Sequence, residues 1–214
     1  MAAGTRIKIC GINSPDSLEA AIAARASHVG FNFFPPSPRF AGTELAARLS
    51  RQAADRILRV GVFVDADDAF LAETLAAAPL DAVQLHGSET ADRIAQVKAR
   101  FGLPVWKVLS VSAREDLQRG SAFAEAADFL LLDAKTPKGT LPGGMGLSFD
   151  WTLLSGWKPP LPWGLAGGLS PSNVGDAIRT TGAPLVDTAS GVESAPGVKD
   201  ASLIAAFCAA AASA

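Results

Sequence analysis

The chain of 214 residues has only two cysteines and two histidines, and it carries no excess of positive charge. Cys10 and Cys208 lie near opposite ends and neither belongs to a Cys-x-x-Cys pair, which argues against a disulfide framework and a zinc ribbon. Lys and Arg number 19 against 21 Asp and Glu, so we expect neither nucleic acid nor a membrane surface as partner. Any catalysis must therefore use very few groups or rely on carboxylates.

Long apolar runs are also lacking. The N-terminal residues 1–6 lead into a short apolar segment without the h-region that export requires. The most apolar stretch, residues 201–214, is broken by Ser202 and is typical of an amphipathic helix rather than a membrane span. We therefore expect a cytoplasmic protein, and the hydrophobic fraction of 49% is ample for a large core.

Short apolar runs alternate along the chain with segments of helical spacing. The repeat is about 25 residues, enough for one strand and a crossover helix. Helix starts are indicated by Ser14-Pro15-Asp16 and by residues 169–174, and Ile94, Val97 and Phe101 lie at helical spacing. We expect strands at 7–10, 28–34, 58–64, 82–85, 105–108, 129–133, 163–166 and 185–188.

Eight strand-helix units without a linker predict one α/β domain over residues 1–214, an all-parallel (β/α)8 TIM barrel. The alternative is an open doubly wound sheet. Against it, the first strand is followed by Cys10-Gly11-Ile12-Asn13-Ser14 and not by G-x-G-x-x-G. In a barrel, chemistry lies at the C-terminal ends of the strands.

Several polar side chains stand at those ends. Lys8 and Cys10 share the inward face of the first strand, where the ammonium would favour a thiolate and must itself find a carboxylate, either Asp133 or Asp187. The alternative interpretation is that Cys10 is a small buried hydrophobic residue. Asp133 follows an apolar run, and its carboxyl group could serve as a general acid or as a helix cap. His86 is expected to be a hydrogen-bonded wall residue rather than a metal ligand.

Three loops are candidates for ligand binding. The proline-rich loop after residue 34 would hold Arg39 where its planar fork takes a carboxylate or a phosphate. Glycine-bearing turns end the last two strands and suit a phosphate site, with Gly167 and Gly168 in one and Ser190 and Gly191 in the other. A third cluster, with Gly143, Gly144 and Gly146, resembles a mobile lid or an ordinary surface loop.

Taken in order, these motifs make the chain resemble the phosphoribosylanthranilate isomerases. The resemblance is carried by residues 8–11, 30–40, 60–64 and 83–87, by Leu132-Asp133, by residues 143–151 and 167–169, and by residues 190–200. It implies an isomerase of tryptophan biosynthesis that converts N-(5'-phosphoribosyl)anthranilate, a small phosphosugar, by an Amadori rearrangement without metal or cofactor.

The resemblance also implies a role for each candidate. Cys10 would be the general base at sugar C2' and Asp133 the general acid at the furanose oxygen, while Arg39 would hold the anthranilate carboxylate. His86 and Asp187 would support the substrate, and backbone groups of Gly167, Gly168, Ser190 and Gly191 would bind its phosphate. Either a monomer or a homodimer is compatible.

Two positions depart from the family pattern, and three other functions stay open. Pro36 stands where a lysine is expected, and Ala189 where a serine is common. A histidine-pathway isomerase would carry an aspartate at position 10, and a pentose-phosphate epimerase would need metal ligands. A non-catalytic phosphometabolite-binding barrel would tolerate replacement of Cys10 and Asp133.

Overall fold

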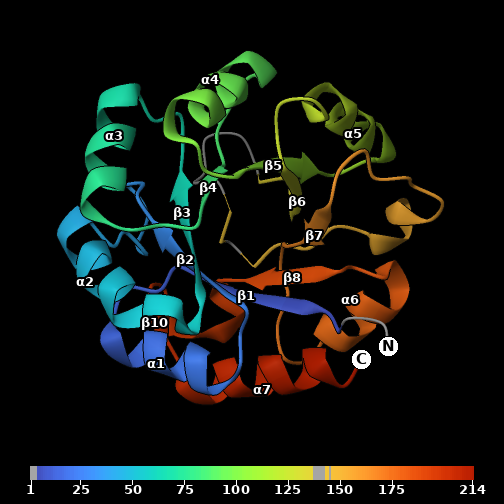
Figure 1. Ribbon diagram of the computed structural model, residues 1–214. Helices are drawn as coiled ribbons and strands as arrows, with labels where there is room; N and C mark the ends of the chain where they lie inside the picture. Colours follow the sequence, from blue (N-terminus) through green and yellow to red (C-terminus); the bar gives the residue numbers. More distant parts are fainter. Residues whose placement is uncertain (1–3, 137–142, 145) are drawn as a thin grey trace.

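The computed structural model describes residues 4–136, 143–144 and 146–214. Eight parallel strands close into a barrel in sequence order, with helices around it (Figure 1), so the predicted (β/α)8 barrel is confirmed. The strands are β1 Arg6–Cys10, β2 His28–Asn32, β3 Leu58–Phe63, β4 Ala82–Leu85, β5 Val105–Val111, β6 Phe129–Ala134, β7 Trp163–Leu165 and β8 Leu185–Thr188.

Helices connect the strands, with one exception. The segment that follows β6 contains only the 3-10 helix η3 (Trp151–Leu154) among its described residues. Gly156, Pro159, Pro160 and Pro162 follow it, and they explain why the expected helix is reduced to one turn. The α-helices are α1 Pro15–Ala23, α2 Thr43–Ala53, α3 Asp68–Ala77, α4 Ala91–Phe101, α5 Arg114–Gln118, α6 Val174–Thr181 and α7 Ala201–Ala212; the other 3-10 helices are η1 Ala54–Arg56, η2 Arg119–Phe123 and η4 Ser190–Val192.

The helix starts follow the predicted caps in part. Ser14 caps α1 by accepting a hydrogen bond from the backbone N–H of Ser17, and Pro15 takes the first helical position. In contrast, α6 begins only at Val174, after a turn that contains Pro171, and its N-cap Asn173 makes no side-chain cap hydrogen bond. Asn173 instead accepts a hydrogen bond from the N–H of Ser170 and donates one to the carbonyl of Gly168, which fixes the loop after β7.

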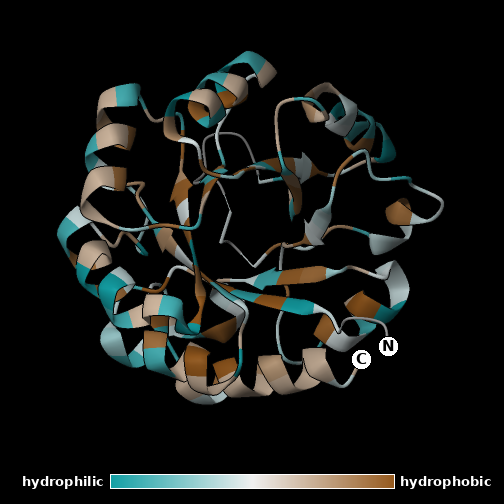
Figure 2. Cartoon of the chain, in the orientation of Figure 1, coloured by the Kyte–Doolittle hydropathy of each residue, from teal (hydrophilic) through white to brown (hydrophobic). Residues whose placement is uncertain are grey.

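The barrel has an outer and an inner apolar layer. Ile7 and Ile9 belong to the outer core with helix residues such as Leu18 and Phe207, as the strand alternation predicts. A separate inner cluster includes Trp106, which packs against Phe129 with ring centroids 4.5 Å apart. Figure 2 shows the largely apolar strands and the polar residues on the helices and loops around them. No helix in the described ranges is long and apolar enough to cross a membrane.

Two short strands that the sequence did not indicate follow β8. β9 (Glu193–Ala195) and β10 (Val198–Lys199) form an antiparallel hairpin, with Lys199 opposite Glu193. Gly197 forms its turn at φ +80°, and a Cβ there would overlap the carbonyl oxygen of Pro38. Asn13 donates a hydrogen bond to the Gly197 carbonyl at 3.0 Å. The hairpin is thus fastened to the loops after β1 and β2.

A buried ion pair joins the first and last strands of the barrel. Lys8 is 0% exposed, and its Nζ lies 2.9 Å from Oδ1 of Asp187, which stands directly opposite in the β1–β8 register. Burial alone would lower the pKa of Lys8, but Asp187 and Cys10 raise it above its ordinary value, so Lys8 is the cation. Of the two carboxylates that the sequence offered to Lys8, the structure selects Asp187.

We expect Lys8→Met to destabilise the protein by about 3–5 kcal/mol, because it leaves the Asp187 carboxylate buried without a counter-charge. Urea unfolding measures the effect. The double variant Lys8→Met with Asp187→Leu should recover most of the loss, since both charges are then gone. Unchanged stability in Lys8→Met would contradict this account of the barrel closure.

Candidate active site

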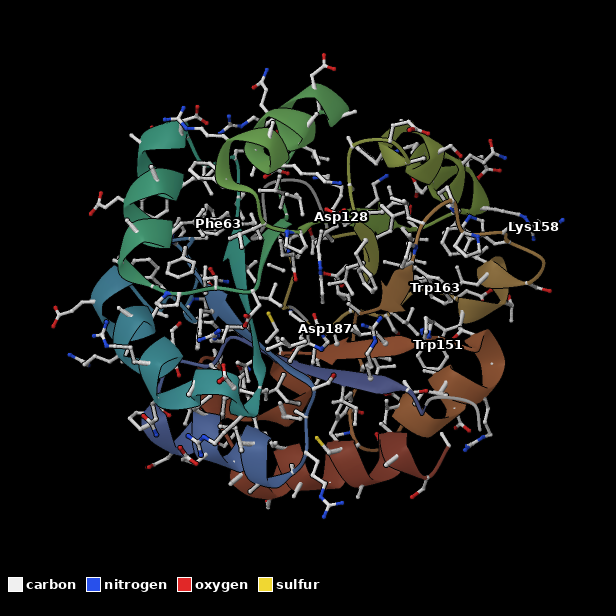
Figure 3. The ribbon with its side chains drawn as sticks, in the orientation of Figure 1. Phe63, Asp128, Trp151, Lys158, Trp163 and Asp187 are labelled. Atoms are coloured by element: carbon white, nitrogen blue, oxygen red, sulfur yellow. The ribbon has the colours of Figure 1, made fainter. Side chains whose placement is uncertain are left out.

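The carboxyl ends of the strands gather the predicted catalytic and substrate-binding side chains around one cavity. Cys10 of β1, Asp133 of β6 and Asp187 of β8 line it together with His86, which follows β4, and Arg39 from the loop after β2. Asp187 lies toward the middle of the barrel in Figure 3. The arrangement follows from the parallel barrel, in which all strand ends open on the same face.

Cys10 lies against Gly30 of the neighbouring strand. A Cβ on Gly30 would stand 2.8 Å from the Cys10 sulfur and 3.1 Å from Lys8 Nζ, so only glycine leaves room for both groups. Burial raises the pKa of the Cys10 thiol above its usual 9.0, although Lys8 and Lys199 act in the opposite direction. Lys8 thus favours the thiolate as the sequence predicted, but burial outweighs it in the unliganded protein.

Asp133 is held by the backbone and faces His86. Its Oδ1 accepts a hydrogen bond from the N–H of Ala134 at 2.8 Å, and its Oδ2 lies 3.4 Å from His86 Nε2. A Cβ on Gly167, at φ +88°, would stand 3.0 Å from Oδ1, and one on Gly143, at φ +71°, would stand 3.1 Å from Oδ2. The two glycines allow backbone to pass close to the carboxyl group on both sides.

Arg39 is buried and already holds a carboxylate of the chain. Its Nε and Nη2 donate to the two carboxylate oxygens of Glu193 at 2.7 Å each, and Nη2 also donates to the Gly144 carbonyl at 3.1 Å. Gly11 makes room for the arginine, since a Cβ there would stand 2.6 Å from Arg39 Cδ. Among the described residues no acceptor meets Nη1, against which the backbone of Gly144 packs.

A second cavity adjoins the first and is lined by glycine-rich backbone. Gly167, Gly168 and Ser190 line it, and Asp133 and Asp187 belong to both cavities. Within the described ranges, no acceptor meets the backbone N–H groups of Gly167 and Gly168. Gly191 is not among the residues that line this cavity, and a Cβ there would overlap the carbonyl oxygen of Leu169.

The glycines of the predicted lid line the cavities, Gly146 only the second one. Gly143 and Gly144 line each of them, and a Cβ on Gly144 would overlap the Arg39 guanidinium. The carbonyl oxygen of Gly146 lies over Gly168, 2.9 Å from where a Cβ would stand. Pro142 and Met145 of the same predicted lid lie outside the described residues.

Three side chains near this site had no role predicted from the sequence. Glu193 binds both Arg39 and Lys199, and the only signal for this pair was its place in the motif of residues 190–200. Gln84 lines the first cavity with its Oε1 buried and no hydrogen-bond partner in the described part of the chain. Across the described residues, no three His, Cys, Asp or Glu side chains are grouped as metal ligands would be.

A parallel eight-stranded barrel with a thiol, a carboxyl group and a glycine-lined cavity at its carboxyl edge defines a (β/α)8-barrel enzyme. A family model described as N-(5'phosphoribosyl)anthranilate (PRA) isomerase matches residues 7–210. The chain belongs to this family.

Individual relatives agree with the family model. An N-(5'-phosphoribosyl)anthranilate isomerase from Rhodospirillum centenum is 51% identical over 97% of this chain and 98% of its own length. The crystal structure of phosphoribosyl anthranilate isomerase from Thermotoga maritima superposes with a TM-score of 0.89 at 34% identity, covering 98% of this chain and 100% of that one. A structure of such an isomerase with reduced 1-(o-carboxyphenylamino)-1-deoxyribulose 5-phosphate has a TM-score of 0.86 at 33% identity and the same coverage.

We predict that the Cys10 thiol of the unliganded protein titrates above 9.0, because burial outweighs the two lysines near it. The ultraviolet absorbance of the thiolate follows the titration, and the chain has no tyrosine whose ionisation would overlap with it. The measurement uses a Cys208→Ala background, since burial raises the pKa of Cys208 to about 11. A midpoint below 9.0 would show that Lys8 and Lys199 dominate.

Proposed function

We propose that this chain converts N-(5'-phosphoribosyl)anthranilate to 1-(2-carboxyphenylamino)-1-deoxyribulose 5-phosphate, with Cys10 as general base and Asp133 as general acid. The observation that carries the proposal is that both side chains line one cavity, next to a glycine-lined cavity suited to a phosphate. The strands that carry them are separated by β7 and β8, so they approach a bound sugar from different directions. The related isomerase with a reduced carboxyphenylamino-deoxyribulose phosphate supports this ligand class.

The rearrangement needs one proton delivered and one removed. Asp133 gives its proton to the furanose oxygen as the bond from that oxygen to C1' breaks, and the lone pair of the anthranilate nitrogen forms a C1'=N iminium. The Cys10 thiolate then takes the proton from C2', whose electrons form the C1'=C2' bond while the nitrogen regains its lone pair. The resulting enolamine becomes the ketone when C1' takes up a proton and the C2' hydroxyl loses one.

The raised pKa of Cys10 fits this order of events. In the empty site the buried thiol stays protonated, which protects it from side reactions. Ring opening places a cationic iminium beside Cys10, and a nearby positive charge favours the thiolate; the thiol proton passes to the carboxylate that Asp133, in the same cavity, has become. Cys10 thus becomes a thiolate at the stage at which the C2' proton of the substrate becomes acidic.

The other predicted residues hold the substrate. Nη1 of Arg39 is directed to the anthranilate carboxylate, and the N–H groups of Gly167 and Gly168, with Ser190 and Gly191, bind the phosphate. His86 lies close to the Asp133 carboxyl, and Asp187, balanced by Lys8, closes the cavity beneath it. Gly143, Gly144 and Gly146 serve as the lid that excludes water.

No step of this scheme uses a metal ion or an organic cofactor. We assign the whole barrel, residues 1–214, to this reaction as one catalytic domain in the cytoplasm, acting as a monomer or homodimer. Neither nucleic acid nor a membrane takes part.

Cys10→Ala and Asp133→Asn are each expected to lower kcat by at least ~100-fold, the lower end of what a positioned base or acid contributes. Turnover is followed by the loss of substrate fluorescence, and circular dichroism verifies the fold. Cys208→Ala is the matched control, since it removes a buried thiol far from the cavity and should keep full turnover. Near-wild-type rates in either site variant would refute the assigned mechanism.

Arg39→Ala should mainly raise KM, because the variant loses the donor to the substrate carboxylate and leaves the acid and base in place. Steady-state kinetics separate KM from kcat. Arg48→Ala, which removes an exposed arginine on α2, serves as the control. An unchanged KM with a collapsed kcat would rule out the carboxylate-binding role.

A further inference from the structure

Three buried charged side chains, Arg39, Glu193 and Lys199, form a cluster next to the cavity that Cys10 and Asp133 line, here called the catalytic cavity. The carboxylate of Glu193 accepts hydrogen bonds from Nε and Nη2 of Arg39 and from Nζ of Lys199, all at 2.7 Å, and from the N–H of Gly197 at 3.2 Å. Lys199 Nζ also donates to the carbonyl of Ala189 at 2.8 Å. The exposed fraction of the side chain is only 9% for Arg39, 4% for Glu193 and 1% for Lys199.

The cluster contains two cations and one anion. Although burial favours the neutral acid, Arg39 and Lys199 hold the pKa of Glu193 below its ordinary range, so Glu193 is a carboxylate. Burial lowers the pKa of Lys199 below its ordinary value although Glu193 opposes the shift, but Nζ of Lys199 lies 2.7 Å from the Glu193 carboxylate, a contact that favours the ammonium. With Lys199 charged, one positive charge is in excess within a desolvated cluster, and such a charge is costly unless a counter-ion meets it.

The geometry shows where that counter-ion would bind. Glu193 occupies the Nε–Nη2 edge of the guanidinium and thereby fixes its plane, while Gly11 and Gly144 pack against the side chain. The Nη1 edge has no acceptor among the described residues, and Arg39 lines the catalytic cavity. An anion in that cavity thus meets a donor that is already oriented and a charge that is not yet balanced.

We propose that Glu193 and Lys199 are positioning residues for Arg39: Glu193 orients its Nη1 toward the substrate carboxylate, and Lys199 neutralises Glu193 so that the charge of Arg39 remains for the substrate. This inference rests on the proposed function, because it takes the anthranilate carboxylate as the anion. The hairpin of β9 and β10 is the element that makes the cluster, since it places Lys199 opposite Glu193.

The test removes the charges one after the other. Lys199→Met leaves Arg39 and Glu193 as a neutral pair, and Lys199→Met with Glu193→Gln restores one net positive charge. Calorimetric titration with anthranilate, and separately with inorganic phosphate, measures the two ends of the site. KM and kcat for N-(5'-phosphoribosyl)anthranilate are measured on the same proteins.

Lys199→Met should raise the anthranilate Kd and the KM roughly tenfold, the scale of one interaction with a charged group, with a smaller change in kcat. The double variant should bind anthranilate at least about threefold more tightly than Lys199→Met, because the net charge returns although the orientation is loosened. A merely structural lysine would give no such recovery, since a second buried substitution would only add damage.

The control variant is Asp81→Asn. It breaks a comparable bidentate pair, Arg59 with Asp81, at the opposite end of the barrel, and it should leave the anthranilate Kd unchanged. Thermal unfolding of every variant records the loss of stability. Lys199→Gln replaces Lys199→Met in the series if the latter does not fold, because it also removes the charge.

The outcomes separate the two claims. An unchanged anthranilate Kd in Lys199→Met, or a double variant that binds no better than Lys199→Met, overturns the positioning role while wild-type turnover still supports the isomerase. Wild-type protein that fails to turn over N-(5'-phosphoribosyl)anthranilate overturns the proposed function itself.

Discussion

The site depends on charge compensation inside a closed barrel. The ammonium of Lys8 is fully buried on β1 and meets the carboxylate of Asp187 across the seam between the first and last strands. This pair places a fixed positive charge beside the Cys10 thiol and a balanced carboxylate at the centre of the cavity. In the cluster around Arg39, by contrast, two cationic side chains face the single carboxylate of Glu193.

Close approach of backbone is the second constraint on the site. Gly30 leaves space for the Cys10 sulfur, and Gly167 and Gly143 leave space on both sides of the Asp133 carboxyl. The left-handed φ angles of Gly167 and Gly143 add to the requirement for glycine. Cys10 and Asp133 thus each lie in a narrow slot of backbone, which limits the motion of the side chain.

The sequence predicted those features of the fold that depend on local patterns of residues. Apolar runs located all eight strands of the barrel, because buried parallel strands are continuous in hydrophobicity. Alternation within residues 7–10 placed Lys8 and Cys10 on the inner face, but the choice of Asp187 over Asp133 as the partner of Lys8 depends on the β1–β8 register. The described residues after β6 contain only a 3-10 turn, for which the prolines were a local signal, whereas the hairpin of β9 and β10 had none beyond Pro196-Gly197.

The interactions that the sequence did not reveal are those between distant residues. Arg39 and Glu193 are 154 positions apart, and no spacing rule connects them. The excess of positive charge in their cluster can be recognised only from the structure, which shows Lys199 buried next to Glu193. For the same reason the dominance of burial over Lys8 at Cys10 could not be read from two residues on one strand, since it arises from all the elements that cover the site.

We propose that groups of this chain alone perform the isomerisation. Turnover of freshly prepared N-(5'-phosphoribosyl)anthranilate by the wild-type protein in the presence of EDTA, followed by the loss of substrate fluorescence, tests this directly. We expect rapid loss of fluorescence at the same rate with and without EDTA. No loss of fluorescence, or a loss that EDTA abolishes and added divalent metal restores, would contradict it.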